Sequence, residues 1–284
     1  KNDNYRGIIP QGDGQTMTVS GQTNGSYYQS YSISFLDPWF GGKRPNSLSV
    51  SAFYSVQTDI SSNYYNSAYM NNYYNYYSGY GSYYNNYYNN YESYYDPDKS
   101  IKMYGLSVGW GKRLRWPDDY FTLSAELSFQ RFILKDWSYL YIRLNNGEYM
   151  TTGRSNNLSL GLTLSRNSTD NPIFPRRGSE FSASVRITPP YSLFSNKDYA
   201  TYGKDDYDEA TSVYKWIEYH KWKFKGKTYT ALSGAQKCPV IMTRTEFGLL
   251  GHYNKYKKSP FETFYVGGDG MTGYSVNYAS ETIA

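Results

Sequence analysis

The sequence predicts an all-β protein, an antiparallel transmembrane β-barrel to which this chain contributes about nine strands. Three observations predict it. Apolar and polar residues alternate with a period of two, the alternating segments are about ten residues long, and short and long connections follow one another. Unbroken apolar runs of ~18 residues, which a membrane-spanning helix requires, do not occur. The sequence therefore excludes a helical membrane protein and favours one built from strands.

Nine segments carry the alternation. In Phe121–Gln130, for example, five apolar residues alternate with Thr, Ser, Glu, Ser and Gln. Successive side chains of a strand point to opposite faces, so such a segment has one apolar and one polar face. The nine segments are Thr16–Gln22, Ser30–Phe35, Ser47–Val56, Tyr104–Gly111, Phe121–Gln130, Asn157–Ser165, Glu180–Ile187 and, less regularly, Tyr214–Leu232 and Val240–Tyr253. No segment predicts a helix with comparable clarity.

The length of these segments suits a bilayer, because a tilted strand of ~9–11 residues crosses the hydrocarbon layer. A sheet in lipid must pair all its backbone groups, so it closes into a barrel with apolar side chains outside and small polar ones around a wet lumen. This arrangement explains a mean hydropathy of −0.74 without disorder. A soluble antiparallel sheet with one solvated face gives the same alternation and remains the alternative.

The connections favour the membrane barrel. Apart from a tight hairpin at Asn24-Gly25, the joins on one side are compact and those on the other are long, which is typical of short periplasmic turns and long external loops. Aromatic residues near strand ends suit the girdles at the two bilayer interfaces. These residues are Trp39, Phe40, Trp110, Trp116, Tyr120, Trp137, Trp216 and Trp222.

Tyrosine accounts for 37 of the 284 residues, and its distribution is uneven. The segment 63–95 alone contains 15 tyrosines and 9 asparagines, with Glu92 as its single charge. We interpret it as a low-complexity insertion in an external loop, an ordered lid whose tyrosines pack on one another. A sticky platform for a surface partner is the alternative, because tyrosine provides large amphipathic contacts.

Residues for catalysis, cofactor binding or metal binding are not indicated. The two histidines, His220 and His252, lie on different predicted strands, and Cys238 is the single cysteine. Gly268–Gly273 matches G-x-G-x-x-G in spelling, but no strand and helix flank it as a dinucleotide site requires. The net charge of +5 is too small and dispersed to predict a nucleic-acid partner. We expect no enzyme and no cofactor.

Two stretches resemble the Omp85 superfamily, in particular its BamA-type barrel-assembly members. Asp170–Phe181 is similar to the family's periplasmic turn, and Phe261–Gly268 to its aromatic–Gly-Gly approach to an inward-folded loop. The resemblance implies functional positions in the turn at Asn171, Pro172, Phe174, Pro175, Arg177 and Gly178. It implies a neck of the inward loop at Phe264, Gly267, Gly268, Gly273 and Tyr274. Two prolines stiffen such a turn, and a glycine adopts the positive φ that it needs.

The chain departs from the family at the loop tip. The family has an Arg-Gly-aromatic tip, whereas this chain reads Met271-Thr272-Gly273-Tyr274. Either the arginine is lost, or an insertion displaces the true tip beyond Ala284. Family barrels have about sixteen strands, and about nine cannot close alone. Residues 1–284 are therefore expected to form part of one outer-membrane barrel domain, with the insertion at 63–95.

The resemblance implies that the protein inserts and folds β-barrel proteins in the outer membrane of a diderm bacterium. Its partners would be unfolded outer-membrane β-barrel substrates, accessory periplasmic or lipoprotein subunits and outer-membrane lipids. An exposed strand edge would template incoming strands by β-augmentation, with no nucleotide or metal. The alternatives are a relative that exports a polypeptide and a passive porin-like channel.

Overall fold

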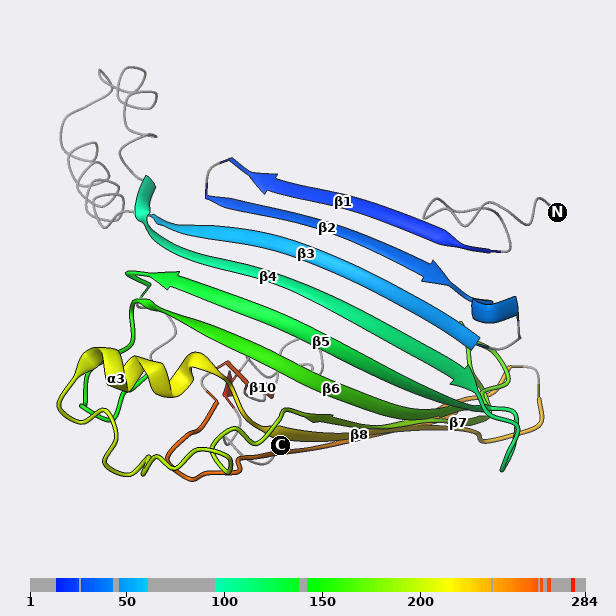
Figure 1. Cartoon of the computed structure of the whole chain (residues 1–284). Helices are drawn as coiled ribbons and strands as arrows, with labels where there is room; N and C mark the ends of the chain where they lie inside the picture. The colour runs from blue at the N-terminus through cyan, green and yellow to red at the C-terminus, as the bar shows by residue number, and fades with distance from the viewer. Residues whose placement is uncertain are drawn as a thin grey trace, which may run out of the picture.

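Nine long strands form one antiparallel sheet in chain order (Figure 1). The computed structural model describes residues 14–25, 27–42, 46–60, 95–137, 142–235, 237–259, 261–262, 265–266 and 277–278. The strands are β1 (Thr16–Asn24), β2 (Tyr28–Asp37), β3 (Asn46–Ile60), β4 (Tyr95–Arg113), β5 (Phe121–Lys135), β6 (Gly153–Asn167), β7 (Gly178–Ile187), β8 (His220–Ala231) and β9 (Val240–Gly251). The short β10 (Tyr265–Val266) pairs with β11 (Asn277–Tyr278). The predicted antiparallel all-β fold is confirmed.

The sheet is open, and β1 and β9 are its two outer strands among the described residues. Each neighbouring pair is antiparallel, and the single shift of register recorded along β3 and β4 lies between Thr58 and Asp59. An open sheet of this kind is what a part of a larger barrel requires, because its outer strands keep unpaired backbone groups for further strands.

One face of the sheet is lined by small polar side chains that bond across the strands. Ser51 and Ser107 approach to 2.7 Å between hydroxyl oxygens, and Ser128 and Ser159 to 2.8 Å. Residues of this face from β3 to β8 surround a common cavity, so it is the concave face of the sheet. The prediction that small polar residues line the inside is therefore confirmed.

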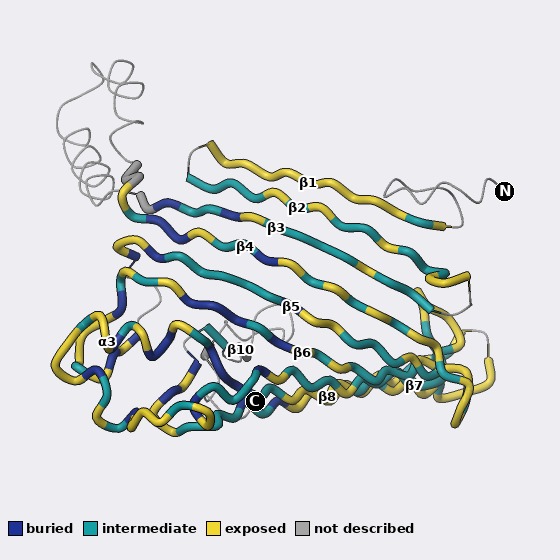
Figure 2. The backbone as a smooth tube through the Cα atoms, in the orientation of Figure 1, coloured by how far each residue is buried: buried dark blue, intermediate teal, exposed yellow. Residues whose placement is uncertain are grey.

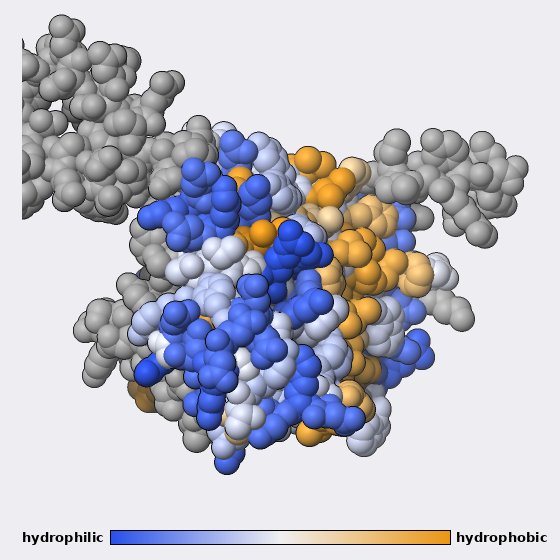
Figure 3. All heavy atoms as spheres, turned by 60° about the vertical axis from the view of Figure 1, so that its left-hand side comes forward, coloured by the Kyte–Doolittle hydropathy of each residue, from blue (hydrophilic) through white to orange (hydrophobic). Residues whose placement is uncertain are grey.

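The outer face carries large apolar side chains that remain exposed, among them Leu106, Leu127, Leu162 and Phe247. In Figure 3 the hydrophobic residues gather on one side of the molecule, next to a hydrophilic end. On β5 the apolar residues of this face run from Phe121 to Phe129, and Arg131 follows on the same face. These nine residues extend ~30 Å along the strand, and a tilted strand of ~9–11 residues is long enough to cross the hydrocarbon layer.

The two ends of the sheet differ in the length of their connections. The short-turn end has the connections 38–45, 114–120, 168–177 and 232–239, and the long-loop end has 25–27, 61–94, 136–152 and 188–219. The hairpin after Asn24 is the predicted exception, and Gly25 adopts a positive φ of 56° there. The asymmetry expected from the sequence is thus present (Figure 1).

The buried core of the described residues lies at the long-loop end, where Figure 2 shows the dark blue segments. Two loops, 136–152 and 188–219, pack against the ends of β4 and β5. The core residues are Ile101, Leu134, Trp137, Ile142, Leu144, Met150, Tyr199, Ala210, Val213 and Tyr214. This core consequently covers the concave face at that end.

The prediction of strand structure from Tyr214 onward is wrong for its first six residues, since β8 begins at His220. The chain there forms α3 (Tyr207–Ser212), which the sequence did not indicate, and the 3₁₀ turn η3 (Val213–Lys215). Asp206 caps α3 by accepting a hydrogen bond from the Asp208 N–H. The apolar residues of this segment are buried in the loop core, and they do not alternate along a sheet. Among the described residues, no helix is long and apolar enough to span a membrane.

The expected ordered tyrosine lid lies outside the described residues, which resume at Tyr95.

Leu162 and Thr163 are neighbours on β6 that point to opposite faces. We expect Leu162→Arg in the full chain to lower the free energy of unfolding in bilayers by about 2–4 kcal/mol, because it places a charge in the hydrocarbon layer. Thr163→Arg is the matched control and should cost much less, since Thr163 faces the polar cavity. Urea unfolding of the protein in vesicles measures both, and equal losses would contradict the assignment of the two faces.

Candidate functional site

The turn 168–177 between β6 and β7 is held by hydrogen bonds from its own side chains. The Asn171 Oδ1 accepts from the backbone N–H of Ile173 at 2.9 Å and of Phe174 at 3.0 Å. The Asp170 Oδ1 accepts from the N–H of Arg176 at 2.9 Å and of Arg177 at 3.2 Å. The turn is therefore fixed locally, by residues that are close in sequence.

Asp170 is not among the turn positions that the resemblance singled out. The backbone N–H groups of Arg176 and Arg177 hold the pKa of its carboxyl below the ordinary value. The Asp170 N–H also donates to the Arg177 carbonyl at 3.1 Å. An aspartate directly before Asn-Pro was the available sequence signal, because Asp side chains commonly accept from backbone N–H groups in turns.

Gly178 ends the turn with a φ of 109°, which side-chain-bearing residues rarely adopt. A Cβ at this position would lie 2.3 Å from the Ser168 carbonyl oxygen, on the opposite side of the turn. Both features require glycine. Directly beside Gly178, the Ser168 N–H donates to the Ser179 carbonyl at 2.9 Å, which continues the pairing of β6 and β7 to the edge of the turn.

The remaining turn positions from the sequence stand at the surface. Pro172 and Phe174 are exposed, Pro175 is half-buried, and the Arg177 side chain points to solvent. The rigid turn thus presents an apolar tip, with Ile173 and Phe174 among the most exposed large hydrophobic residues.

Arg166 joins this turn to the neighbouring turn 114–120. Its guanidinium binds the Asp118 carboxylate at 2.9 Å and donates to the Ser168 hydroxyl at 2.8 Å. The same group lies 5.5 Å from the centre of the Tyr120 ring and 5.7 Å from that of Phe121. Sequence reasoning missed this residue, although an arginine that ends the leucine row of β6 was a visible signal.

Arg176 joins the turn to the one on its other side, 232–239. Its guanidinium donates to the Ala235 carbonyl and lies 3.2 Å from the Cys238 sulfur. This hydrogen bond is the main cause that holds the pKa of the Cys238 thiol below its ordinary value. Three consecutive turns are therefore connected side by side at the short-turn end.

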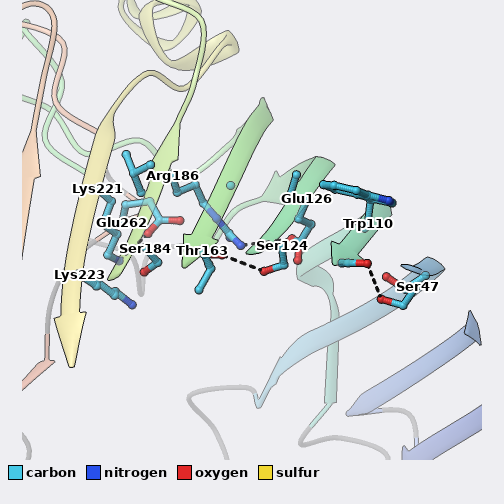
Figure 4. A pocket seen from close by; sticks show the side chains of 16 residues that line it. Ser47, Trp110, Ser124, Glu126, Thr163, Ser184, Arg186, Lys221, Lys223 and Glu262 are labelled. Atoms are coloured by element: carbon cyan, nitrogen blue, oxygen red, sulfur yellow. Dashed lines mark hydrogen bonds and ion pairs between the residues drawn. The ribbon is translucent and has the colours of Figure 1, made fainter. Parts of the chain in front are cut away.

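The concave face surrounds a cavity of about 370 Å³ (Figure 4). Its wall on β3 to β6 consists mainly of small residues, among them Ser47, Gly109, Ser124 and Gly161. Its other wall, on β7 and β8, carries Arg186, Lys221 and Lys223. The concave face thus has one side of mainly small residues and one charged side.

Ion pairs cross the charged side from strand to strand. Arg186 pairs with Glu126 at 3.2 Å, Lys225 with Glu246 at 3.7 Å and Lys227 with Glu180 at 3.6 Å. The pair between Lys221 and Glu262 is shorter, at 2.7 Å, and its side chains are 11% and 20% exposed. Being less accessible to water, it is screened less than the others.

Glu262 belongs to the segment that follows β9, and this segment turns over the concave face. Phe261 stacks on Phe132 of β5, with ring centres 4.5 Å apart. Next to them Tyr219 is fully buried, and burial followed by the charge of Glu262 raises its pKa to about 12. Two adjacent residues thereby attach the chain to β5 and β8.

The same segment is attached at the long-loop end by a buried ion pair. Lys257 lies 3.5 Å from Glu218, and the side chains are 5% and 0% exposed. The Glu218 carboxylate also accepts from the Ser192 N–H at 2.8 Å. Burial lowers the pKa of Lys257, while the charge of Glu218 acts in the opposite direction. Removing one partner would leave an uncompensated buried charge.

The predicted neck of the inward loop, Phe264, Gly267, Gly268, Gly273 and Tyr274, lies outside the described residues. Within the described part of the chain, no group of three or more His, Cys, Asp or Glu residues is arranged to hold a metal ion.

The sequence profile of the Omp85 superfamily domain matches residues 11–283. Among solved structures, the chain is similar to the crystal structure of BamA from Haemophilus ducreyi lacking POTRA domains 1-3, with a TM-score of 0.55 and 17% sequence identity. The match covers 91% of this chain and 39% of that chain, so this chain spans about two fifths of the BamA chain. No curated protein sequence matches.

Gly178→Val should strongly reduce the folded fraction of the barrel, because it adds a clash with the Ser168 carbonyl to a backbone strain of about 1–3 kcal/mol. Gly147→Val is the matched control, since Gly147 also has a positive φ, 89°, but nothing lies within 4 Å of its added Cβ. The shift in gel mobility between unheated and heated samples reports the folded fraction. Equal effects of the two variants would contradict the close approach at Gly178.

The contact between Arg176 and Cys238, which joins the turns 168–177 and 232–239, can be tested by the reactivity of the Cys238 thiol. Arg176→Met should slow alkylation of Cys238 at neutral pH and move the rate profile to higher pH, because the thiolate loses the donor that stabilises it. Arg177→Met is the control, as the Arg177 side chain makes no described contact with Cys238. An unchanged profile in Arg176→Met would contradict the contact.

Proposed function

We propose that this chain, which belongs to the Omp85 superfamily, is part of the barrel domain of an outer-membrane protein that inserts and folds other β-barrel proteins. The proposed domain comprises residues 1–284 with the Tyr/Asn-rich insertion at 63–95. The short-turn end would face the periplasm and the long-loop end the cell exterior. The proposed partners are unfolded outer-membrane β-barrel substrates, accessory periplasmic or lipoprotein subunits and outer-membrane lipids.

The observation that carries this proposal is that Phe261 and Glu262, which follow β9, are attached to the concave face of the sheet. A protein that only conducts solutes needs an unobstructed lumen, whereas here the chain after β9 reaches back to β5 and β8. A lumen occupied by the protein's own chain leaves the strand edges as the places where a substrate can pair. Backbone pairing at an edge needs no nucleotide, because each strand added satisfies polar groups that lipid cannot.

Polypeptide export is the second candidate, and the row of lysines on β8 favours it. Lys221, Lys223, Lys225 and Lys227 all point to the concave face, where a passing chain would meet them. Lys221, Lys225 and Lys227 each pair with a carboxylate in the sheet or in the segment after β9. This pairing reduces the field that would guide a translocating chain, so we place assembly first.

Assembly can be tested by folding an unfolded barrel substrate into vesicles that contain the full chain. We expect folding to be faster than in empty vesicles, and Lys221→Met to slow it because the anchor at Glu262 is lost. Lys225→Met is the matched control, as it breaks a more exposed ion pair on the same face of the same strand. The exchanged pair Lys221→Glu with Glu262→Lys should restore part of the rate.

The rival functions give different results in the same vesicles. A substrate that accumulates inside the vesicles in soluble, protease-protected form would indicate export. A steady ionic conductance without any effect on substrate folding would indicate a passive channel. Folding at the rate of empty vesicles would overturn the proposed assembly function.

A further inference from the structure

The three connected turns at the short-turn end share a pattern that the assembly function does not use. Each turn exposes at least one large apolar side chain and a cation. The apolar residues are Trp116, Phe174 and Leu232, which are 83%, 79% and 58% exposed. The cations are Arg115, Arg177 and Lys237, all exposed. We call these six residues the turn rim.

The carboxylates near the turn rim are engaged elsewhere. Asp118 binds Arg166, Asp119 lies 3.9 Å from Arg113, and Asp170 accepts from backbone N–H groups of its own turn. In the described part of the chain, no carboxylate pairs with a cation of the rim. The three turn segments together contain six cations and three carboxylates, which gives a net charge of +3. These segments are Arg113–Tyr120, Arg166–Arg177 and Leu232–Pro239.

The rim directly continues the outer apolar face. On that face the apolar residues of β4 and β6 end at Lys112 and Arg166, immediately before the turns. Phe121 marks the same border on β5. A surface that lies just beyond an apolar band of bilayer thickness stands at the depth of the lipid headgroups.

We propose that the turn rim binds anionic phospholipid headgroups of the leaflet at the short-turn end. Trp116, Phe174 and Leu232 insert into the interface, and Arg115, Arg177 and Lys237 contact the phosphates. Aromatic side chains favour this depth, and each cation near an anionic surface contributes about 1 kcal/mol. The inference rests on the membrane location in the proposed function, and it specifies the class of lipid that is bound and the residues that bind it.

The turn 168–177 is rigid. The Phe174 N–H donates to the Asn171 Oδ1, and the Arg176 N–H donates to the Asp170 Oδ1, so the backbone on both sides of the exposed Phe174 side chain is fixed. Arg166 and Arg176 fix the turn to its two neighbours. A preorganised apolar tip loses little conformational entropy when it enters the interface.

The test uses the full chain with Phe174→Cys and Cys238→Ser, which leaves one thiol for an environment-sensitive fluorophore. In phosphatidylcholine nanodiscs we expect a blue-shifted emission that spin-labelled lipid quenches. With phosphatidylglycerol present, spin-labelled phosphatidylglycerol should quench more than spin-labelled phosphatidylcholine. In the double variant Arg115→Gln and Arg177→Gln, the preference for phosphatidylglycerol over phosphatidylcholine should fall by about fivefold for each cation removed.

Lys204→Gln with Lys255→Gln is the matched control, because it removes two exposed cations from the long-loop end and should keep the preference. An emission typical of water at residue 174 would overturn the proposal, as would an unchanged preference in the Arg115 and Arg177 variant. Substrate folding is measured separately, so a failure of lipid binding with intact assembly is distinct from a failure of the proposed function.

Discussion

Backbone hydrogen bonding in a hydrocarbon layer is the constraint on which the described structure depends. Each strand must pair with a neighbour along its whole length, because lipid offers no donor or acceptor. Antiparallel pairing of nine strands in chain order satisfies this with short connections at one end. Once the ladder is fixed, the two faces are free to differ, and exposed leucines on one side coexist with bonded serines such as Ser128 and Ser159 on the other.

The strands could be predicted because their signal is local. Alternation along Phe121–Gln130 identifies a strand, its length and its two faces without knowledge of any other segment. The loop core could not be predicted in this way. The Ile217 N–H donates to the Asn156 carbonyl of β6, and Tyr214 packs in the core with residues of loop 136–152. The positions of both residues therefore depend on residues far away in sequence. The irregular spacing of these apolar residues led to the extended β8 of the sequence prediction.

The same distinction applies to the candidate functional site. The turn that ends at Gly178 was visible in the sequence, since the bonds within the turn join residues at most eleven positions apart. The anchor of Glu262 on Lys221 spans forty-one positions, and its partners are recognised only when the sheet brings β8 beneath the segment after β9. Arg166 is intermediate, because its place in a leucine row was evident but its bond to Asp118 was not.

The two ends of the sheet are consequently stabilised by different physics. The short-turn end relies on side-chain to backbone bonds that remain largely exposed to water, and it can form as soon as two neighbouring strands pair. The long-loop end relies on burial and on the pair of Lys257 and Glu218, which gains strength only after several loops have excluded water. In the proposed assembly function, this division would let the strand pairing change at one place while the rest of the sheet stays folded. The turns would then hold the strand register, while the ion pairs of Lys221 with Glu262 and of Lys257 with Glu218 would limit the movement of the chain after β9.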